Sequence, residues 1–432
     1  MDEMRILMAY TDQPNQKEIA TYEANGGYQA IRQAIPKLTP EQVIEMVKQS
    51  ELRGRGGAGF ITGSKWGFVP KNISGPKYVV CNCDESEPGT FKDRFLIEKD
   101  PHQLIEGIIL ASYAIQAKQA YIYCRGEYFE GIAILRQAVK EAQAKGYLNQ
   151  KLFGSEFAVE IIVHPGAGAY IAGEETALLN SLEGFRATPR LKPPFPAIAG
   201  LYQKPTVVNN VETLCNVVHI IKNGVEWFKG IGKPKNTGTK IFQISGHVQK
   251  PGCYEFPLGV TLRRVLEAAG GMFPGRKFKA CYPGGSSCAL LNERDLDISM
   301  DFESLAARHT ALGTASLIVM DDSADMVKVA NRLMQFYQNE SCGKCTPCRE
   351  GTRWMVQVLT RIENGGGTFS DLKLIEQVCQ DMAANSFCPL AVGAAPPIVS
   401  AVQEFKGEFE AYIRRNPKAD QRPEMHVSYP YL

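Results

Sequence analysis

Three cysteines within seven residues, Cys342, Cys345 and Cys348, constrain this chain more than any other feature. Thiolates at this C-x2-C-x2-C spacing can bind three corners of an iron–sulfur cluster, whose fourth ligand then comes from elsewhere in the chain. Cys388 is the preferred fourth ligand, because its Ser-Phe-Cys-Pro context predicts a loop between two helices. Cys379 is the rival, but it occupies an apolar position inside a predicted helix.

Two alternatives stay open for these residues: a structural zinc site, or cysteines that bind no metal. Structural zinc usually takes two separated pairs of ligands, so the close triplet favours a [4Fe-4S] cluster.

The first residues of the chain include two acids where a signal peptide would carry basic residues. We therefore expect a cytoplasmic, reducing setting, in which the 12 cysteines do not form a disulfide framework.

Composition excludes several classes of protein. Hydrophobic residues make up 44% and charged residues 22% of the 432 residues, which is typical of a globular chain of about three domains. The 48 basic and 46 acidic residues leave a net charge of +2, so we expect no nucleic-acid partner. No run approaches the roughly 18 apolar residues of a membrane helix, so we expect no direct membrane insertion.

The first half of the chain alternates between two periodicities. Apolar runs predict strands, and helical spacing of apolar residues between them predicts a layered α/β fold with a mostly parallel sheet. Thr39 followed by Pro40 predicts the start of an earlier helix. The predicted strands span 77–82, 120–124 and 157–164, and the predicted helices span 102–117 and 129–145.

The later part of the chain changes pattern twice. A segment rich in Gly, Pro and Lys at 230–238 indicates a domain boundary, and 240–269 then predicts strand, turn, strand and helix, a small α+β unit. From residue 323 the pattern is helical. We therefore divide the chain into domains at 1–235, 236–322 and 323–432.

Two glycine-rich loops are candidate nucleotide sites. The run from Gly54 to Phe60 fits G-x-G-x-x-G, but a helix precedes it, so it is either a phosphate- or ring-binding loop or a plain surface loop. The loop from Pro165 to Gly173 follows a predicted strand and precedes a helix that starts with Glu174 and Glu175, a favourable geometry for a nucleotide. These carboxylates either favour the helix dipole or bind ribose hydroxyls and repel a 2′-phosphate.

Three carboxylates, Asp84, Glu85 and Glu87, follow the strand predicted at 77–82. They fit a metal site or an acid–base pair, but also a solvated strand end, and no histidine supports the first two readings. The residues alone leave these readings open.

Together these segments resemble one family, the NADH-oxidising flavoprotein subunit of respiratory complex I. The resemblance extends over about residues 25–415. It implies a Rossmann-like FMN domain, a ubiquitin-like α+β domain and a C-terminal helical bundle with a [4Fe-4S] cluster. The segments that carry it are 52–60, 82–94, 166–184, 192–196, 205–213 and 340–349.

The resemblance also implies site residues. Cys342, Cys345, Cys348 and Cys388 correspond to the cluster ligands. NADH is expected to contact Glu87, Glu174, Glu175 and Lys192, with its adenine on Phe60, Phe68 or Phe195, and Glu87 is assigned the catalytic role. FMN is expected at Gly54, Gly56, Gly57, Lys65, Asn82, Asp84, Glu85, Tyr170, Gly173, Val208, Asn209, Asn210 and Thr213, and the first glycine loop adds Arg55, Ala58 and Gly59 to the cofactor-binding set.

One position departs from the family pattern. Members usually carry alanine where Cys83 stands, between Asn82 and Asp84. A thiol near the flavin is able to alter its potential or its sensitivity to oxidation, so the redox tuning of this chain is left open.

The function that follows is electron input to NADH-quinone oxidoreductase. NADH delivers two electrons as hydride, an iron–sulfur cluster accepts one at a time, and FMN connects the two without a dedicated acid or base. The expected partners are a thioredoxin-like [2Fe-2S] subunit of the E type and a large iron–sulfur subunit of the G type, in the peripheral arm of a membrane-bound complex. The alternatives are a diaphorase subunit of an NAD-coupled hydrogenase or formate dehydrogenase, and a non-catalytic metal-binding scaffold.

Overall fold

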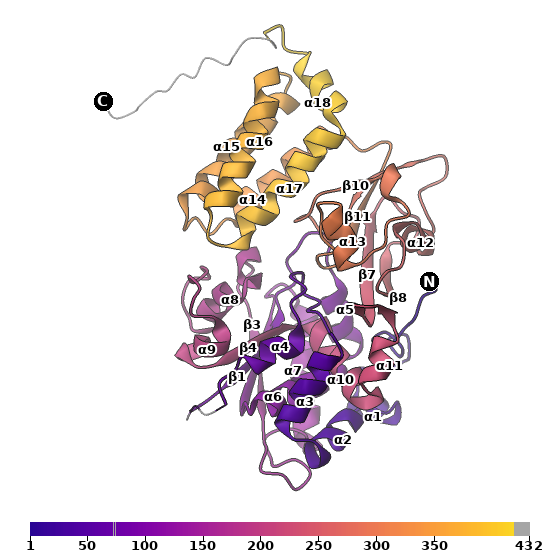
Figure 1. The fold of residues 1–432 in the computed structure, drawn as a ribbon, viewed down its shortest axis with the longest axis vertical. Helices are drawn as coiled ribbons and strands as arrows, with labels where there is room; N and C mark the ends of the chain where they lie inside the picture. Colours follow the sequence, from indigo (N-terminus) through magenta and orange to yellow (C-terminus); the bar gives the residue numbers. More distant parts are fainter. Residues whose placement is uncertain (72, 74, 419–432) are drawn as a thin grey trace, which may run out of the picture. The chain divides into compact units, whose positions relative to one another are not determined.

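The computed structural model describes residues 1–71, 73 and 75–418 (Figure 1). They form two compact units. The first unit contains Met1–Gly285 and Leu291–Asp321, and the second contains Ser286–Leu290 and the chain from Asp322 onward.

The first unit is built on a parallel sheet, which confirms the predicted α/β architecture. Its strands are β1 (Tyr78–Cys83), β2 (Gln119–Cys124), β3 (Glu160–Pro165) and β4 (Thr206–Asn210). They lie in the order β3-β2-β1-β4, and every neighbouring pair is parallel.

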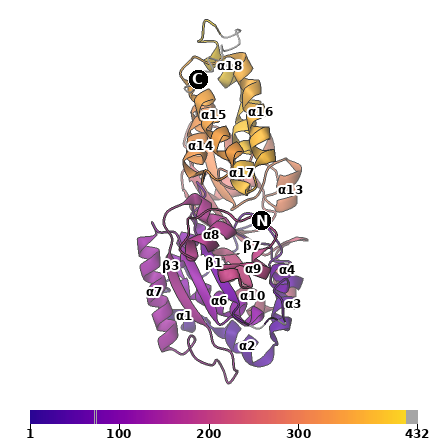
Figure 2. The same ribbon diagram turned by 90° about the vertical axis from the view of Figure 1, so that its left-hand side faces the viewer.

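Helices cover both faces of this sheet (Figure 2). Leu104, Ile108 and Leu214 pack with one face, and Leu178 and Leu179 pack with the other. The helices on the first face are α5 (Lys92–Lys99), α6 (Pro101–Ile115), α7 (Phe129–Ala144) and α10 (Val211–Asn223), and α8 (Glu175–Leu182) lies on the second.

The third strand begins later than the apolar run predicts. The N–H of Leu152 donates to the carbonyl of Phe157 at 3.0 Å, and that of Asn149 donates to the carbonyl of Val159 at 2.9 Å. Because a loop uses these carbonyls, regular pairing with β2 starts only at Glu160.

Short helices surround this core. The predicted helix start at Thr39 is confirmed: its side chain accepts from the N–H of Gln42 at 3.3 Å, and Gln42 Oε1 accepts from the N–H of Thr39 at 2.8 Å. Their bounds are Ile19–Ala24 (α1), Gln29–Lys37 (α2), Pro40–Gln49 (α3), Thr62–Gly67 (α4), Pro196–Ala199 (α9) and Val225–Lys229 (α11), with 3-10 turns at Tyr170–Gly173 and Leu201–Gln203.

A second, mixed sheet completes the first unit. Its strand order is β10-β9-β11-β7-β8, with β11 and β7 parallel and the other neighbours antiparallel. It forms the predicted small α+β fold with its own apolar core. The bounds are Thr239–Gly246 (β7), Gly252–Pro257 (β8), Leu262–Ala268 (α12), Phe278–Tyr282 (β9), Leu291–Asn292 (β10), Phe302–Ala307 (α13) and Ser316–Asp321 (β11), and a small ribbon pairs Gly232–Lys233 (β5) with Asn236–Thr237 (β6).

The second unit is helical, as predicted. Its helices are α14 (Met326–Glu340), α15 (Thr346–Glu363), α16 (Phe369–Asn385), α17 (Pro389–Glu404) and α18 (Lys406–Ile413). In the part of the chain that the structure describes, no helix is long and apolar enough to cross a bilayer.

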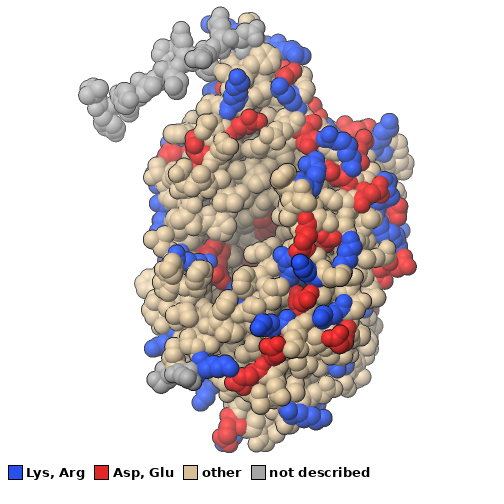
Figure 3. All heavy atoms as spheres, in the orientation of Figure 1, with Lys and Arg blue, Asp and Glu red and all other residues tan. Residues whose placement is uncertain are grey.

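On the face drawn in Figure 3, basic and acidic side chains are interspersed.

Glu106, on α6, caps the helix α2, which is far from it in the sequence. Its fully buried carboxylate accepts the N–H groups of Tyr28, Ala30 and Ile31 at 2.7, 2.8 and 3.2 Å, and the hydroxyl of Tyr22 at 2.6 Å. The first N–H groups of a helix have no partner within it, so α2 depends on this side chain.

We expect Glu106→Ala to lower the free energy of unfolding by about 3 kcal/mol, because it leaves several buried donors without an acceptor. Urea unfolding followed by circular dichroism measures this loss. Glu98→Ala is the control: Glu98 pairs with the half-exposed Arg94 on α5, and its loss is expected to cost about 0.5 kcal/mol or less. Equal losses in the two variants would contradict the capping role.

Candidate functional site

The ends of β1 and β4 form the centre of the candidate site. The strand order reverses here, because β2 and β3 extend the sheet on one side of β1 and β4 lies on the other. Ligands of open α/β sheets bind beyond the carboxyl ends of strands at such a switch point. Asn82 and Asn210 lie opposite each other in register there, and Val208 and Asn209 precede Asn210 on β4. Asn209 Oδ1 accepts from Trp66 Nε1 at 2.8 Å.

Asn82 joins the acidic loop to the second glycine loop. Its Nδ2 donates to the carbonyl of Gly173 at 2.8 Å, and its Oδ1 accepts the N–H of Asp84 at 3.1 Å. The hydroxyl of Tyr170 donates to Glu87 Oε2 at 2.7 Å. These predicted site residues, from the two separate segments 82–87 and 170–173, therefore lie together.

Glu85 points elsewhere. Its two oxygens accept the N–H groups of Asp93 and Arg94, each at 2.8 Å, and Glu85 Oε2 also accepts the hydroxyl of Tyr128 at 3.1 Å. Burial, with the nearby Asp93 charge, raises the pKa of Glu85 to about 7. The structure thus uses this predicted cofactor residue to cap α5.

Glu174 is also a helix cap. Its Oε2 accepts the N–H groups of Thr176 and Ala177, both at 2.9 Å, at the start of α8. Its other oxygen lies 3.2 Å from Lys192 Nζ. The helix-dipole reading of this residue therefore matches its geometry.

Glu175 lies between two lysines. Lys65 Nζ donates to one of its oxygens at 2.9 Å and to the carbonyl of Val208 at 2.8 Å, and Lys192 Nζ donates to the other oxygen at 2.8 Å. Burial opposes ionisation, but the two ammonium groups outweigh it and lower the pKa of Glu175. An ionised carboxylate is therefore held next to the end of β4.

The first glycine loop folds back over the start of α10. The N–H of Gly54 donates to the carbonyl of Phe60 at 2.8 Å and closes the loop. The N–H of Arg55 donates to Thr213 Oγ1 at 2.8 Å. Two predicted cofactor segments, far apart in sequence, are joined by this bond.

The absence of side chains at these glycines leaves room for a ligand. A Cβ on Gly56 would lie 3.0 Å from Asn210 Cβ, whereas one on Gly57 would meet no atom within 4 Å. A Cβ on Gly173 would come no closer than 3.6 Å to Asp84. Open backbone at Gly57 and Gly173, with amides from Asn82 and Asn210 beside it, fits a phosphate-bearing planar cofactor.

Aromatic rings lie exposed next to this backbone. Phe60, Phe68 and Phe195 are 53%, 57% and 57% exposed, although large apolar side chains are usually buried. The rings of Phe60 and Phe68 lie 6.1 Å apart between centroids. Phe195 precedes α9, and no ring contact joins it to either residue in the described part of the chain. The Phe60–Phe68 pair is thus available to stack on a base.

The second unit brings the four predicted cluster cysteines together. Cys345 and Cys388 are the N-cap residues of α15 and α17. Cys348 lies in the first turn of α15, with its Sγ 3.2 Å from Ser341 Oγ. Burial raises the pKa of Cys348 to about 11, and the charges of Cys342, Cys345 and Cys388 contribute to this rise.

Cys379 has different surroundings. It lies inside α16, where burial and Glu376 raise the pKa of its thiol to about 12. Over residues 1–71, 73 and 75–418, no three side chains of His, Cys, Asp or Glu meet as closely as a single metal ion requires. A cluster of several irons holds its four ligands farther apart than one ion does.

Comparison with known proteins gives the family. The Nuo51 FMN-binding domain matches residues 47–219, the NADH-ubiquinone oxidoreductase-F iron-sulfur binding region matches 328–412, and the SLBB domain matches 241–289. The NADH-quinone oxidoreductase F subunit 2 of Rhizobium meliloti is 54% identical over 94% of this chain and 97% of its own length. The F subunit of the Escherichia coli NADH-quinone oxidoreductase is 48% identical over 91% and 89%.

The chain belongs to the family of NADH-quinone oxidoreductase F subunits. This confirms the resemblance, with FMN and a [4Fe-4S] cluster as the cofactors of the family. Among solved structures, an NAD+-reducing [NiFe]-hydrogenase in the H2-reduced state aligns with a TM-score of 0.84 and 34% identity, over 95% of this chain and 67% of that one. The fold is therefore shared with that oxidoreductase as well.

Cys83, the position at which this family member departs from the usual pattern, points into the core. Its Sγ lies 3.7 Å from Cys124 Sγ, and both thiols belong to the buried cluster that also contains Cys81. Val80, on the opposite face of β1, packs in the cluster that contains Leu178. Because neighbouring residues of a strand face opposite ways, the thiol points away from the face of Asn82, which removes the structural reason to expect direct redox tuning.

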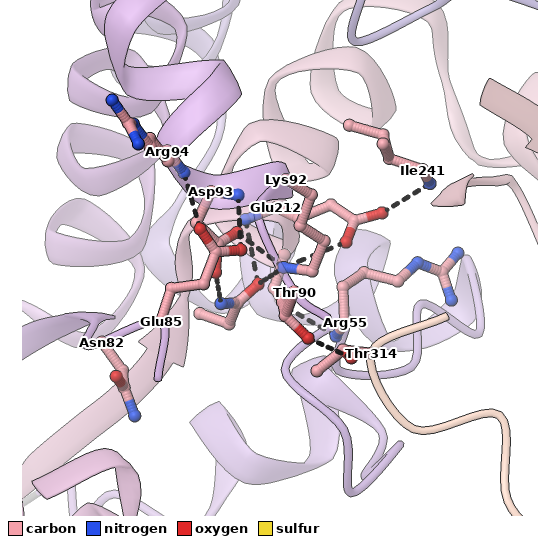
Figure 4. A network of polar contacts seen from close by, with 12 residues as sticks. Arg55, Asn82, Glu85, Thr90, Lys92, Asp93, Arg94, Glu212, Ile241 and Thr314 are labelled. Atoms are coloured by element: carbon pink, nitrogen blue, oxygen red, sulfur yellow. Dashed lines mark hydrogen bonds and ion pairs between the residues drawn. The ribbon is translucent and has the colours of Figure 1, made fainter. Parts of the chain in front are cut away.

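The sequence analysis missed a group of buried charges below the site (Figure 4). Lys92, Asp93, Glu212 and Lys240 are all buried and lie in one polar network with Asn210. No spacing in the sequence links these positions, because they come from α5, α10 and β7. Charged residues are rarely buried unless they are paired. The burial and the pairing of these four residues are visible only in the folded structure.

We expect Gly59→Ala to remove most of the bound FMN. Gly59 has φ +65°, and an added Cβ would lie 2.5 Å from the ring of Phe302, so the loop has to move. The flavin content of the purified protein, from its visible spectrum after acid release, measures the effect. Gly67→Ala is the control, since a Cβ there meets no atom within 4 Å. Full flavin content in Gly59→Ala would show that the loop does not bind the cofactor.

Proposed function

We propose that this family member oxidises NADH with an FMN bound at the ends of β1 and β4, and releases electrons singly through a [4Fe-4S] cluster on Cys342, Cys345, Cys348 and Cys388. The observation that carries the proposal is the Asn82–Asn210 pair at the switch point of the sheet, with a glycine loop against each residue. The family membership supports the same chemistry.

The residues of the chain serve to bind and orient. FMN, when bound, accepts hydride from a nicotinamide and passes electrons on one at a time. Direct hydride transfer needs no general acid or base, so correct placement of the two rings is the main requirement. Gly57 leaves its backbone open to a phosphate, and the carboxylate of Glu87, held by Tyr170, is assigned contact with the reacting nucleotide.

The same surface fits the rest of NADH. The exposed rings of Phe60 and Phe68 are suited to stack on adenine. Lys65 and Lys192 surround Glu175, which stays ionised and is able to accept bonds from ribose hydroxyls. Its charge also opposes the 2′-phosphate of NADPH.

A second candidate function is the diaphorase part of an NAD-coupled hydrogenase. The structural similarity to the NAD+-reducing [NiFe]-hydrogenase favours it, at 34% identity. Relatives that are NADH-quinone oxidoreductase subunits reach 54% identity and cover nearly their whole length, so quinone reduction is the preferred destination of the electrons.

The name of each relative describes one subunit of a larger enzyme, which supports assembly with other subunits. We assign the chain to the peripheral arm of a membrane-bound complex, on the cytoplasmic side. Its partners there are a thioredoxin-like [2Fe-2S] subunit of the E type and a large iron–sulfur subunit of the G type. An exit for single electrons requires such acceptors.

We expect the wild-type protein to prefer NADH strongly over NADPH, and Glu175→Gln to reduce this preference about tenfold, the effect of about 1.4 kcal/mol of lost charge repulsion. Steady-state kcat/KM values for both nucleotides measure it. Glu183→Gln is the control, because Glu183 pairs with Arg190 at the other end of α8. Equal wild-type kcat/KM values for the two nucleotides would refute the carboxylate argument.

We expect Cys388→Ser to lose the cluster and Cys379→Ser to keep it, because Cys388 is the N-cap of α17, whereas Cys379 is buried inside α16. Iron content and the low-temperature EPR signal of the reduced protein test this. Both variants are expected to reduce ferricyanide with NADH, since FMN and cluster are assigned to different units. A folded, flavin-loaded Cys388→Ser protein without ferricyanide reduction would contradict the division of labour.

A further inference from the structure

A fully buried lysine contacts Asn210 of the proposed FMN site. Lys92 is the first residue of α5, and its Nζ lies 2.6 Å from Asp93 Oδ1, 3.0 Å from Asn210 Oδ1 and 3.2 Å from Glu212 Oε2 (Figure 4). An ammonium group has three N–H donors. All three are therefore matched by acceptors.

The network holds the amide of Asn210 at both ends. Asn210 Oδ1 accepts from Lys92 and from the N–H of Glu212, each at 3.0 Å, and Nδ2 donates to Asp93 Oδ2 at 2.6 Å. An amide oxygen has two lone pairs and an amide nitrogen has two hydrogens. Among residues 1–71, 73 and 75–418, the oxygen is thus fully used, and one N–H of the amide is left to donate.

The position of this amide matters to the site. Asn210 lies opposite Asn82 in register and packs under Gly56, where even a Cβ would come within 3.0 Å. A rotated or flipped amide would present an acceptor in place of a donor. FMN carries oxygen acceptors on its phosphate and ring carbonyls, so the difference decides between a bond and a repulsion.

We propose that Lys92 is a positioning residue of the flavin site, which fixes the Asn210 amide so that its free N–H is presented to an acceptor oxygen of FMN. The inference rests on the proposed function. Lys92 acts through the oxygen of the Asn210 amide, and Asp93 holds the nitrogen of the same amide.

Lys92 is suited to this role because it remains charged. Burial opposes the ammonium form, but the carboxylates of Asp93, Glu212 and Glu85 outweigh it and raise the pKa of Lys92. Lys240 provides a contrast in the same network. It also binds Glu212, but its other bond goes to the carbonyl of Ile241, and burial lowers its pKa to about 8.

Lys240 is therefore a matched control. Both lysines are fully buried, and both pair with Glu212, but the bond to Asn210 belongs to Lys92. Replacing either with Met removes a buried positive charge beside the same carboxylate. A purely structural role predicts similar consequences for FMN in the two variants, whereas the positioning role predicts different ones.

The experiment measures the dissociation constant of FMN for the flavin-depleted full-length chain, by quenching of flavin fluorescence, together with the thermal midpoint of each variant. We expect Lys92→Met to raise the dissociation constant about tenfold and Lys240→Met to change it less than about twofold. In an Asn210→Ala background, Lys92→Met is expected to add less than about twofold, because the two residues act as one unit. The proposal would be overturned if the two lysine variants raised the dissociation constant of FMN equally. It would also be overturned if Lys92→Met raised the dissociation constant as much in the Asn210→Ala background as in the wild-type chain.

Asn210→Asp keeps the proposal testable if Lys92→Met does not fold. The carboxylate keeps the bonds to Lys92 and to the N–H of Glu212 but has no donor and faces Asp93, so we expect the dissociation constant of FMN to rise about tenfold or more relative to the wild-type chain. Unchanged affinity in a folded Asn210→Asp protein would overturn the proposal. If the wild-type chain itself binds no FMN, it is the proposed function that fails rather than the role of Lys92.

Discussion

The first unit depends on one buried carboxylate, Glu212. It pairs with Lys92 and Lys240 and accepts the N–H of Ile241 at 3.0 Å. Burying a charge is unfavourable for folding unless the charge is paired and hydrogen-bonded. Removing one of these partners alone is therefore expected to lower the free energy of unfolding strongly. Because Lys92 belongs to α5 and Lys240 to β7, this single group links the start of α10 to a helix of the first sheet layer and to a strand of the second sheet. Within this network it is Lys92, and not Lys240, that also bonds to Asn210 of the proposed flavin site.

Most carboxylates around the site have structural duties. Glu85 caps α5, Glu174 caps α8, and Glu175 is shared by two lysines. These polar side chains therefore stabilise the helices and loops around the site. The open glycine backbone and the exposed aromatic rings remain available to bind a flat, phosphate-bearing ligand. This suits hydride transfer, for which the chain has to align two rings rather than supply a proton.

Local patterns in the sequence predicted much of this fold. The parallel sheet and its helices follow from apolar periodicity, the start of α3 follows from Thr39 and Pro40, and the grouping of cysteines follows from their spacing. The direction of Cys83 was also available, because a strand that turns Asn82 one way turns its neighbour the other. This alternation is a better guide to the direction of the thiol than its proximity to Asn82 along the chain.

Other features had no local signal. Lys92, Glu212 and Lys240 are far apart in the sequence, and charged residues are usually solvated, so only the packed structure reveals their pairing. The same holds for Glu106, which caps a helix from another helix 75 residues away or more. Tertiary contacts of this kind decide which carboxylates are free for a ligand, and the capping role of the Glu85 side chain is one that the sequence does not reveal.

The central claim is that one chain takes electrons from NADH in pairs and passes them on singly. An anaerobic titration of the purified full-length protein with NADH tests it most directly, with visible absorbance and low-temperature EPR recorded at each addition. The account predicts that NADH bleaches a flavin absorbance and that the EPR signal of a reduced [4Fe-4S] cluster rises with it. A protein that contains zinc instead of iron, or whose flavin and cluster spectra do not respond to NADH, would contradict the account.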